Sequence, residues 1–524
     1  MAEHIYDKND LIKSLDGILN KTLGEIDNKE IFQNAQKFNL QKGIAGTVIE
    51  QCVFGYPPDT KQEADLIIVD GEKQIKTELK TTGMKTKPKN GKHYIAKEPM
   101  SITAVGVYDL ASQDFLSSHF WEKLEHMLLV YYHYTAAKAV PPYKYKDFPV
   151  IDYEFHEFSE DDIETLRKDW ECVHSLVNEV VRKFPGEKNK EWKELVKNEY
   201  LLQRGRLRKE LTYIDLAPKF PPRFRLKKPV VSSMISNHFG YKLEQLPGRY
   251  TVISDIDRKC KEITSLYGGK TIGELADEFG IPRITDSGNE NKGIVEQVVV
   301  KMFGGKSKKL NKIELFSRFG LIAKSIAVTP SGGRTEDMKL FHIDFEEIVQ
   351  KEYMDEDGVL REKIFEDSEL YSYFADHEFL CIMLMEPETE YAINEETGKK
   401  EEVKHPLTMN KFLGFKRLVF SDDFIDMTVR KVWEDTRDKI MHNKVEDVIQ
   451  RYKDGREKIL KCGEVSSAPN FIKSAENAVF IRGSAQESSS EFKTESVNGV
   501  KMLPQYVWIK GKEVADLLKE LPLL

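Results

Sequence analysis

The sequence predicts a mixed α/β protein of the α+β kind, built from two tandem domains of one fold, the second of them degenerate. Three observations lead to this prediction. The chain has 524 residues, more than one compact core usually holds. Helical and strand patterns are mixed along it. The pattern of the first half returns in the second. We expect the first domain over residues 1–240, a connector over 241–290 and the second domain over 291–524.

Composition is that of a soluble globular protein. Hydrophobic residues make up 40% and charged residues 32%, with a mean hydropathy of −0.49. The longest apolar run, residues 127–132, is far shorter than the roughly 20 residues that cross a bilayer, and no apolar signal core follows the first Met. The five cysteines are scattered and form no C-x-x-C pair, which indicates ordinary thiols rather than disulfides or a zinc site. We therefore expect a cytoplasmic protein without a membrane anchor.

The elements of the first half follow one another in a readable order. Apolar residues at helical spacing predict a helix over 8–21, and an apolar face after a pair of glycines predicts another over 42–55. Two β-branched runs, 65–69 and 74–82, flank an Asp-Gly pair, which is a strong hairpin signal. We further expect strands over 100–110 and 127–134, and helices over 119–126, 159–183 and 229–238.

Four segments of the first half return in the second half in the same order. The pairs are 42–55 with 292–305, 115–129 with the run ending at 384, the segment around Trp170 with that around Trp433, and the segment from 222 with that from 505. Four matches in one order are hard to attribute to chance. We infer two copies of one fold, joined by a connector that contains a helical stretch of its own.

The candidate chemistry lies in the first copy. Residues two apart in a strand point to the same side, so Glu78 and Lys80 should project together while Leu79 packs into the core. Asp65 on the neighbouring strand can lie beside Glu78, and a third acid, Glu50, can come from the preceding helix. Crowded carboxylates repel one another unless a cation neutralises them, and Mg²⁺ suits that role because it binds carboxylates, waters and phosphate oxygens.

This arrangement predicts metal-assisted hydrolysis of a phosphodiester, with Lys80 placed to orient the attacking water or to stabilise charge on phosphorus. A Glu-x-Lys triplet alone is weak evidence, because such triplets are common on protein surfaces. A half-exposed strand with a solvated charged face is the alternative interpretation.

Charge is unevenly distributed along the chain. The net charge of −8 argues against a protein that coats nucleic acid nonspecifically, yet residues 201–228 hold nine basic and two acidic residues. Such a patch can lie against DNA phosphates, and a solvated face is again the alternative. The candidate DNA contacts there are Arg204, Arg206, Arg208, Arg223, Arg225, Lys227 and Lys228.

At this point the residues resemble a family. The pattern Lys42-Gly43-x-x-Gly46-x-x-x-Glu50, followed by Asp65 and then by Glu78-Leu79-Lys80-Thr81, resembles the MutH mismatch-repair endonuclease and its restriction-enzyme relatives of the Sau-three-A type, which are PD-(D/E)xK nucleases that cut at GATC. The segment around Lys123 resembles the family segment that supplies a further active-site lysine. The resemblance covers roughly residues 1–240. Because the second half repeats the pattern of the first, both copies would be MutH-like domains.

The resemblance implies roles for individual residues. Glu50, Asp65 and Glu78 would hold Mg²⁺, Lys80 and Lys123 would assist at the scissile phosphate, and Lys42 would join the DNA contacts. The sequence departs from the family in two places. The gap between Asp65 and Glu78 is longer, and Arg225 stands where the repair enzyme has an aromatic residue.

The second copy keeps the fold pattern and loses the acids. Val300 falls opposite Glu50, Ile322 opposite Glu78, and His377 or a neighbour opposite Lys123, while Lys324 matches Lys80 and Glu314 could stand near the place of the metal-site aspartate. One carboxylate and a lysine hold Mg²⁺ poorly, so we expect this half not to cut. Trp508 and Lys510 are its candidate DNA contacts. The family resemblance implies that this half binds a second recognition site and activates the first half, and a scaffold that only completes packing is the alternative.

Together with these observations, the family resemblance implies a type II restriction endonuclease, an Mg²⁺-dependent site-specific deoxyribonuclease that makes double-strand breaks at GATC. One centre per chain must serve two strands of a palindrome, so we expect a DNA-induced homodimer or successive nicks. A nicking endonuclease of mismatch repair and a catalytically inactive DNA-binding regulator are the alternatives.

Overall fold

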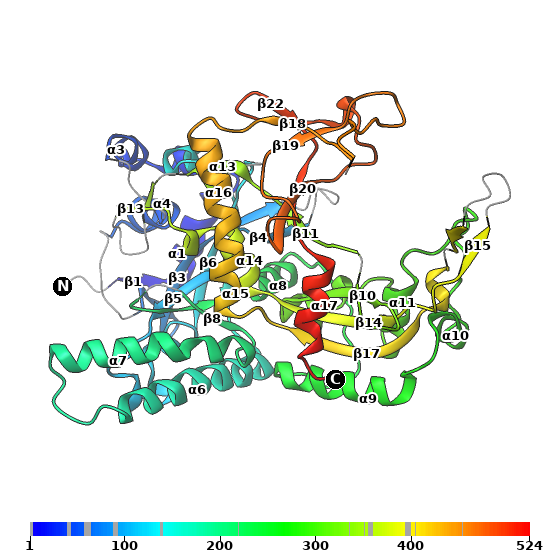
Figure 1. The fold of residues 1–524 in the computed structure, drawn as a ribbon. Helices are drawn as coiled ribbons and strands as arrows, with labels where there is room; N and C mark the ends of the chain where they lie inside the picture. The colour runs from blue at the N-terminus through cyan, green and yellow to red at the C-terminus, as the bar shows by residue number, and fades with distance from the viewer. Residues whose placement is uncertain are drawn as a thin grey trace.

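The computed structural model describes most of the chain (Figure 1). The described residues are 4–38, 43–56, 64–86, 93–136, 140–217, 220–334, 336–350, 352–354, 360–393, 400–403, 405–452 and 454–524. Within them, no helix is long and apolar enough to cross a membrane. The five cysteines all lie in this part of the chain and are free thiols, as predicted.

A mixed sheet forms the centre of the first half. Its strands are β1 (Ile5–Asp7), β2 (Leu66–Asp70), β3 (Lys73–Thr86), β6 (Met127–His133) and β7 (Val150–His156) in that order, with β4 (Tyr94–Ala96) pairing with β3. The β1–β2 and β3–β6 pairs are parallel and the other pairs are antiparallel. The predicted hairpin is β2–β3, in which Asp70 pairs with Lys73 and Gly71 adopts a φ of 64°, a conformation that glycine takes without strain.

Strand β6 shows why this sheet has a layer of helices on each face. Residues Leu128, Val130 and Tyr132 pack into one apolar cluster, and the alternate residues of the strand pack into another, as a strand buried on both faces requires. The first cluster includes residues of α1 (Lys8–Asp16), α2 (Leu23–Ile26), α3 (Ile31–Phe38), α4 (Ile44–Val48) and the π-helical turn η1 (Ile49–Phe54). The second includes α5 (His119–Glu122), α6 (Glu160–Arg182), α7 (Lys190–Gln203) and α8 (Lys228–His238). The predicted helix over 119–126 is shorter because Lys123 caps its C-terminus.

A second, smaller sheet completes the first half. Its strands are β5 (Met100–Ala104), β9 (Arg223–Leu226) and β8 (Ile214–Leu216), in the order β5-β9-β8 and all antiparallel. The predicted strand over 100–110 ends at Ala104, and Leu110 already belongs to a 3-10 turn. Helix α8 begins directly after β9, so the basic segment of the sequence runs through this sheet into a helix.

The second half repeats both strand orders. Its larger sheet is β10 (Leu321–Val328), β14 (Glu378–Met385) and β17 (Lys411–Leu418), parallel and then antiparallel, as in β3-β6-β7. Its smaller sheet is β11 (Met338–His342), β23 (Gln505–Ile509) and β20 (Val479–Gly483), antiparallel as in β5-β9-β8, and α17 (Gly511–Lys519) follows β23 as α8 follows β9. These orders are what the predicted repeat requires, and the division into tandem domains stays a prediction.

The remaining elements connect and cover these sheets. The helices are α9 (Ile253–Tyr267), α10 (Ile272–Glu278), α11 (Ile294–Met302), α12 (Glu314–Arg318), α13 (Phe345–Val349), α14 (Glu369–Asp376), α15 (Asp422–Phe424) and α16 (Arg430–Met441). Four short hairpins are β12–β13 (Glu352–Met354 and Leu360–Glu362), β15–β16 (Tyr391–Ile393 and Lys400–Glu402), β18–β19 (Asp447–Ile449 and Ser467–Pro469) and β21–β22 (Glu495–Val497 and Val500–Met502). Figure 1 shows β15 on an arm that stands away from the body of the protein.

The two halves share one apolar core. Leu380, Ile382 and Leu384 of β14 belong to the same cluster as Leu129 of β6, whereas the alternate residues of β14 pack into a separate cluster of the second half. Helices α9 and α10 bury Ile256 and Leu275 in the shared cluster. The expected connector over 241–290 is therefore part of the folded core, where its apolar helical faces are covered.

Candidate active site

The β2–β3 hairpin brings the two predicted acids together. Leu66 pairs with Thr77, so one further step of the same register sets Asp65 opposite Glu78. The Leu79 backbone N–H donates to Oδ2 of Asp65 at 2.9 Å, which fixes that carboxylate against β3. Leu79 itself is buried in the apolar cluster that includes α1 to α4 and η1. Lys80 reaches the neighbouring Glu78 carboxylate. The predicted alternation of β3 is confirmed at these three positions.

Two lysines hold the Glu78 carboxylate. Lys80 Nζ lies 2.6 Å from Oε1, and Lys123 Nζ lies 3.0 Å from Oε1 and 2.8 Å from Oε2. Glu78 is 1% exposed and Lys123 is 7% exposed, so this is a buried charge cluster, which is stable only when its charges are paired. Lys123 reaches the cluster because it caps α5 just before β6 begins.

The electrostatics of the cluster follow from burial and from its mixture of signs. Burial, together with the neighbouring charge of Glu78, raises the pKa of Asp65 to about 6, although Lys80 and Lys123 act in the opposite direction. Burial alone would lower the pKa of Lys80, but Glu78 and Asp65 outweigh it and raise that pKa. Lys80 therefore stays protonated at neutral pH, as a positive charge beside the two acids.

Glu50 approaches Asp65 and Glu78 from the layer of helices that contains α4 and η1. It lies in η1, which continues α4, and is half-buried. A Cβ atom at Gly46 would lie 3.8 Å from Oε1 of Glu50 and 3.5 Å from Oγ1 of Thr81, the residue after Lys80. The second glycine of the K-G-x-x-G pattern thus lies where α4 meets β3, but these distances are ordinary van der Waals contacts, so the structure does not require the close backbone approach that the sequence predicts.

The acids do not form a closed three-ligand centre. The residues that the structure describes contain no group of three or more His, Cys, Asp and Glu side chains set as a metal ion needs. Both oxygens of Glu78 are engaged by lysines, and one oxygen of Asp65 by a backbone N–H. Asp65 and Glu78 still fit a hard divalent cation, which takes one or two carboxylates plus waters and phosphate oxygens. The assignment of Glu50, Asp65 and Glu78 as ligands stays a prediction.

Sequence reasoning missed one residue at this place, Tyr56. Its backbone N–H donates to the carbonyl of Glu50 at 3.2 Å, and its ring stacks on His4 with centroids 4.2 Å apart. Tyr56 follows Gly55, which ends η1 in the left-handed conformation with a φ of 78°. The Gly-aromatic pair after the predicted helix is the signal that could have pointed to it.

The residues predicted to bind DNA lie in different surroundings. Arg223 donates to Oγ of Ser101 at 3.2 Å, and its charge acts on Lys80, so it faces the catalytic side. Arg206 is exposed and pairs with Glu179 at 3.2 Å. Arg204 lines a pocket between the two halves. Lys42 lies outside the described residues.

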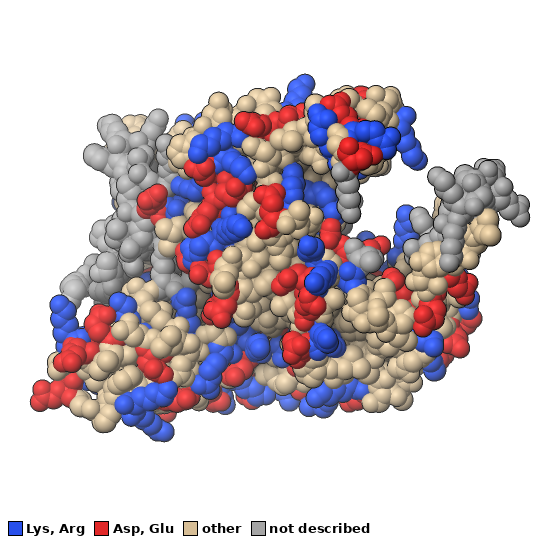
Figure 2. Space-filling view, viewed as in Figure 1, with Lys and Arg blue, Asp and Glu red and all other residues tan. Residues whose placement is uncertain are grey.

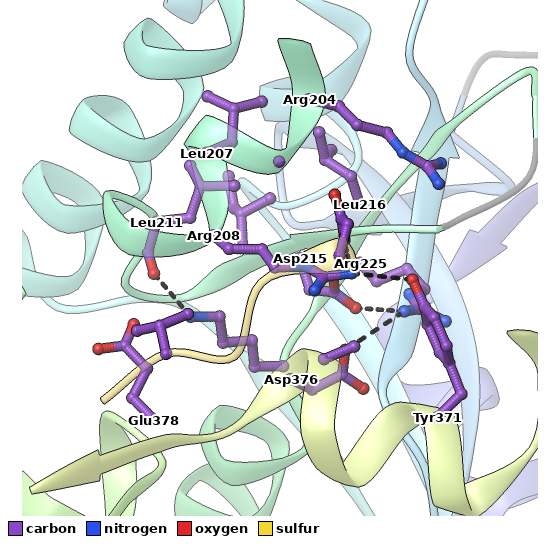
Figure 3. A pocket seen from close by; sticks show the side chains of 16 residues that line it. Arg204, Leu207, Arg208, Leu211, Asp215, Leu216, Arg225, Tyr371, Asp376 and Glu378 are labelled. Atoms are coloured by element: carbon purple, nitrogen blue, oxygen red, sulfur yellow. Dashed lines mark hydrogen bonds and ion pairs between the residues drawn. The ribbon is translucent and has the colours of Figure 1, made fainter. Parts of the chain in front are cut away.

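Other members of the basic segment point into that pocket between the halves (Figure 3). Arg208 pairs with Asp422 at 2.6 Å, and Arg225 pairs with Asp215 and lies 4.0 Å from Asp376. The Lys227 ammonium, which is also buried, donates to the Leu211 carbonyl at 2.6 Å. Three of the predicted DNA contacts are therefore engaged within the protein: Arg208 by an acid of the second half, and Arg225 and Lys227 by groups of the first half. A role on DNA for these residues stays a prediction.

A group of lysines lies beyond β9. Burial lowers the pKa of Lys228, and the nearby positive charges of Lys85 and Lys97 lower it further against the pull of Glu369. Glu98 also acts against this lowering, and its carboxylate lies 3.2 Å from the Lys97 ammonium. Lys228, one of the predicted contacts, lies at the start of α8, and its role on DNA stays a prediction.

The corresponding sheet of the second half combines cations with aromatic rings. The Arg482 guanidinium lies 3.9 Å from the centroid of the Trp508 ring, and the Lys339 ammonium lies 3.3 Å from that of Tyr506. Lys510 is exposed at the start of α17. Over the face shown in Figure 2, positive and negative side chains are intermixed, so charge alone does not outline a DNA surface there.

The comparisons with known proteins follow this geometry. Residues 54–169 match the family model of the DNA mismatch repair enzyme MutH, and this segment carries Asp65, Glu78, Lys80 and Lys123. The chain is also 22% identical over 422 residues to the type II restriction enzyme Sau3AI of Staphylococcus aureus, covering 77% of this chain and 75% of that enzyme. These two matches support a family of the MutH and Sau3AI type for this chain.

The similarity to Sau3AI extends beyond the segment that carries the motifs. An alignment of 422 residues exceeds either half, so the resemblance to Sau3AI is wider than the residues 1–240 expected from the motifs. The MutH-type segment begins just after Glu50 and ends within α6, so it contains the β2–β3 hairpin, α5 and β6. These are the elements that place the Glu78 cluster.

Proposed function

We propose that this MutH and Sau3AI-type protein is a type II restriction endonuclease that requires Mg²⁺ and cuts both strands of DNA at GATC. The class of enzyme, a site-specific endonuclease, follows from the two matches. The observation that carries the proposed centre is the facing pair Asp65 and Glu78 with two lysine ammonium groups on Glu78. GATC is the recognition sequence that the family resemblance implies. The proposed location is the cytoplasm.

The residues of this site suit phosphodiester hydrolysis. In the reaction, the oxygen of a water molecule bonds to phosphorus, one ester P–O bond breaks, and a proton reaches the leaving oxygen. Lys80 is the more exposed of the two lysines, with 23% of its side chain accessible, so it is placed to contact the phosphate or the attacking water. Lys123 is held more deeply and keeps the Glu78 carboxylate in position. Mg²⁺ held by Asp65 and Glu78, with Glu50 nearby, would neutralise charge and make bound water more acidic.

Digestion of an unmethylated plasmid tests the activity. We expect the purified full-length chain with Mg²⁺ to yield defined fragments whose ends map to GATC, and to yield none in EDTA. Nicked circles alone would favour the mismatch-repair type of nickase. A mobility shift without cleavage would favour a DNA-binding regulator and would contradict the proposal.

The second half is proposed to bind a second recognition site and thereby activate the first. Support comes from its cation-aromatic sheet and from the apolar core and ion pairs that join it to the first half. A short uncuttable GATC duplex added in trans should accelerate cleavage of a one-site substrate, while a scrambled duplex should not. Equal rates with both duplexes would leave only a scaffold role for this half.

Cleavage of both strands needs two centres or two events. Each chain carries one proposed centre, so we propose that two chains assemble on a palindromic site. Sedimentation of the protein with and without a GATC duplex should show a homodimer only with DNA. A monomer in both conditions would favour successive nicks.

A further inference from the structure

Tyr56 is tied to both segments that deliver the acids. Its ring lies between His4, at 4.2 Å between centroids, and Phe54, at 6.4 Å. His4 in turn makes a hydrogen bond of 3.1 Å between Nδ1 and the backbone carbonyl of Asp65. With its own N–H on the Glu50 carbonyl, the Tyr56 ring is fixed relative to both of these acids. Contacts to both segments therefore fix the position of Tyr56.

The hydroxyl of Tyr56 is buried without a partner. The residue is 7% exposed, and its hydroxyl has no hydrogen-bond partner in the described part of the protein. Leaving a buried hydroxyl unpaired costs about 1–3 kcal/mol, so a second molecule that pairs with it gains that contribution. Burial raises the pKa of this hydroxyl, and the charges of Glu50, Asp65 and Glu78 raise it further. It is therefore a neutral O–H on which the three predicted acids act.

An unpaired buried hydroxyl does not by itself mark a site. Tyr200 on α7 is also fully buried, and its hydroxyl also lacks a partner among the described residues. The charged groups that act on Tyr200 are Arg204 and Asp215, and none of the predicted catalytic acids is among them. What distinguishes Tyr56 is its position beside the acids of the proposed centre.

We propose that Tyr56 is a positioning residue of the catalytic site, whose hydroxyl hydrogen-bonds a water molecule in the hydration shell of the divalent cation held at Asp65 and Glu78. The inference rests on the proposed function. Water is the partner that suits both neighbours, because it can accept from the hydroxyl and donate to a carboxylate. Mg²⁺ keeps several of its waters when protein carboxylates bind it, and such outer partners orient a metal site.

The test compares two substitutions that each remove one unpaired hydroxyl, Tyr56→Phe and Tyr200→Phe, in the full-length protein. Two quantities are measured: the Mg²⁺ concentration that gives half-maximal single-turnover cleavage, and the Kd for Mn²⁺ by calorimetry without DNA. We expect Tyr56→Phe to raise both by about tenfold, within the range found for outer partners of metal sites. Tyr200→Phe should change neither.

Thermal unfolding in EDTA separates this role from a structural one. Because Tyr56→Phe removes a hydroxyl that has no partner, the metal-free protein should melt at the same temperature or slightly higher. Wild-type metal dependence of Tyr56→Phe would overturn the inference, and so would a lower melting temperature in EDTA with unchanged Mn²⁺ affinity. Glu78→Gln is measured in parallel. If it cuts and binds Mn²⁺ like the wild type, the proposed function fails; if only Tyr56→Phe behaves as wild type, the inference on Tyr56 fails alone.

Discussion

The two halves have the same strand orders and different charges on them. Strand β3 carries Glu78 and Lys80 beside β6, whereas β10 carries Ile322 and Lys324 beside β14. In the second half, Lys324 donates to the backbone carbonyl of Lys339 at 2.9 Å instead of meeting a carboxylate. The comparison teaches that the apolar alternation of the strands determines the fold of each half. The chemistry depends on a few strand positions, such as 78 and 322, whose residues can differ without changing that fold.

The likeness extends to local hydrogen bonds. Ser118 and Ser368 each begin the helix before the central strand, α5 and α14, and each donates to the carbonyl three residues earlier at 2.6 Å. Each also accepts the backbone N–H three residues later, at 3.2 and 3.0 Å. Yet α5 ends at Lys123 of the charge cluster, while α14 leads to His377, whose pKa burial lowers to about 4. One helix delivers a cation and the other a neutral ring.

The largest difference between the halves should appear on removing an acid. Asp65→Asn keeps an acceptor for the Leu79 N–H and removes the charge, so it should slow single-turnover cleavage by about 10³-fold or more while DNA binding persists. The change for comparison in the second half is Glu314→Gln, at the acid that the sequence predicts near the place of the metal-site aspartate and that pairs with Arg318 at 3.1 Å. It should cut as the wild type does. Equal losses in both variants would contradict a single centre in the first half.

The two strand lysines give the next comparison. Lys80→Met should reduce the cleavage rate by about 10²-fold, because it removes a positive charge from the reacting phosphate. Lys324→Met should leave the rate unchanged, since that lysine serves a backbone carbonyl. Rates measured at saturating Mg²⁺ and DNA decide between them. A loss in Lys324→Met as large as in Lys80→Met would move part of the chemistry to the second half.

The ion cluster between the halves should make stability depend on pH. Burial, together with Asp215, raises the pKa of Asp376 to about 7 even though Arg225 acts against it. Between pH 4 and pH 7 the unfolded chain has released this proton while the folded chain retains it, so stability falls as pH rises through this window. We expect Asp376→Asn to flatten that fall by about 1–2 kcal/mol in urea unfolding. An unchanged pH profile would show that Asp376 is ordinarily ionised in the fold.

The smallest effects should come from the two matched serine caps. Ser118→Ala and Ser368→Ala should each lower the free energy of unfolding by about 1 kcal/mol, the usual contribution of such a cap. Only Ser118→Ala should also reduce cleavage, because α5 positions Lys123. Urea unfolding and initial rates on the same preparations provide the test. A loss of cleavage in Ser368→Ala alone would reverse the comparison.

The local part of the site could be predicted from the sequence, because it depends on short-range rules. The Asp-Gly turn sets the β2–β3 register, and that register places Asp65 opposite Glu78. Period-two alternation likewise predicts that Leu79 is buried while Lys80 reaches Glu78. A place for Lys123 at the site was expected only through the family resemblance, and its salt bridge to Glu78 was not predicted, because its position depends on where a short helix ends.

The partners of the basic segment could not be predicted from the sequence. Arg208 meets Asp422 and Arg225 approaches Asp376, more than 150 residues away, and no local pattern reports such contacts. The stacking of His4 on Tyr56 is another contact between distant parts of the sequence, although the Gly-aromatic pair at Gly55 and Tyr56 is a local signal for the residue itself. A run of basic residues predicts charge, and only the packing of the two halves determines which of those charges face solvent.

The position of the metal ion tests the central claim most directly. Crystals of the protein grown with a GATC duplex and Mn²⁺ would locate the ion by its anomalous scattering. The account predicts a peak at coordination distance, about 2.1–2.2 Å, from carboxylate oxygens of Asp65 and Glu78. A peak bound elsewhere, with these two carboxylates still held only by Lys80, Lys123 and the Leu79 N–H, would contradict it.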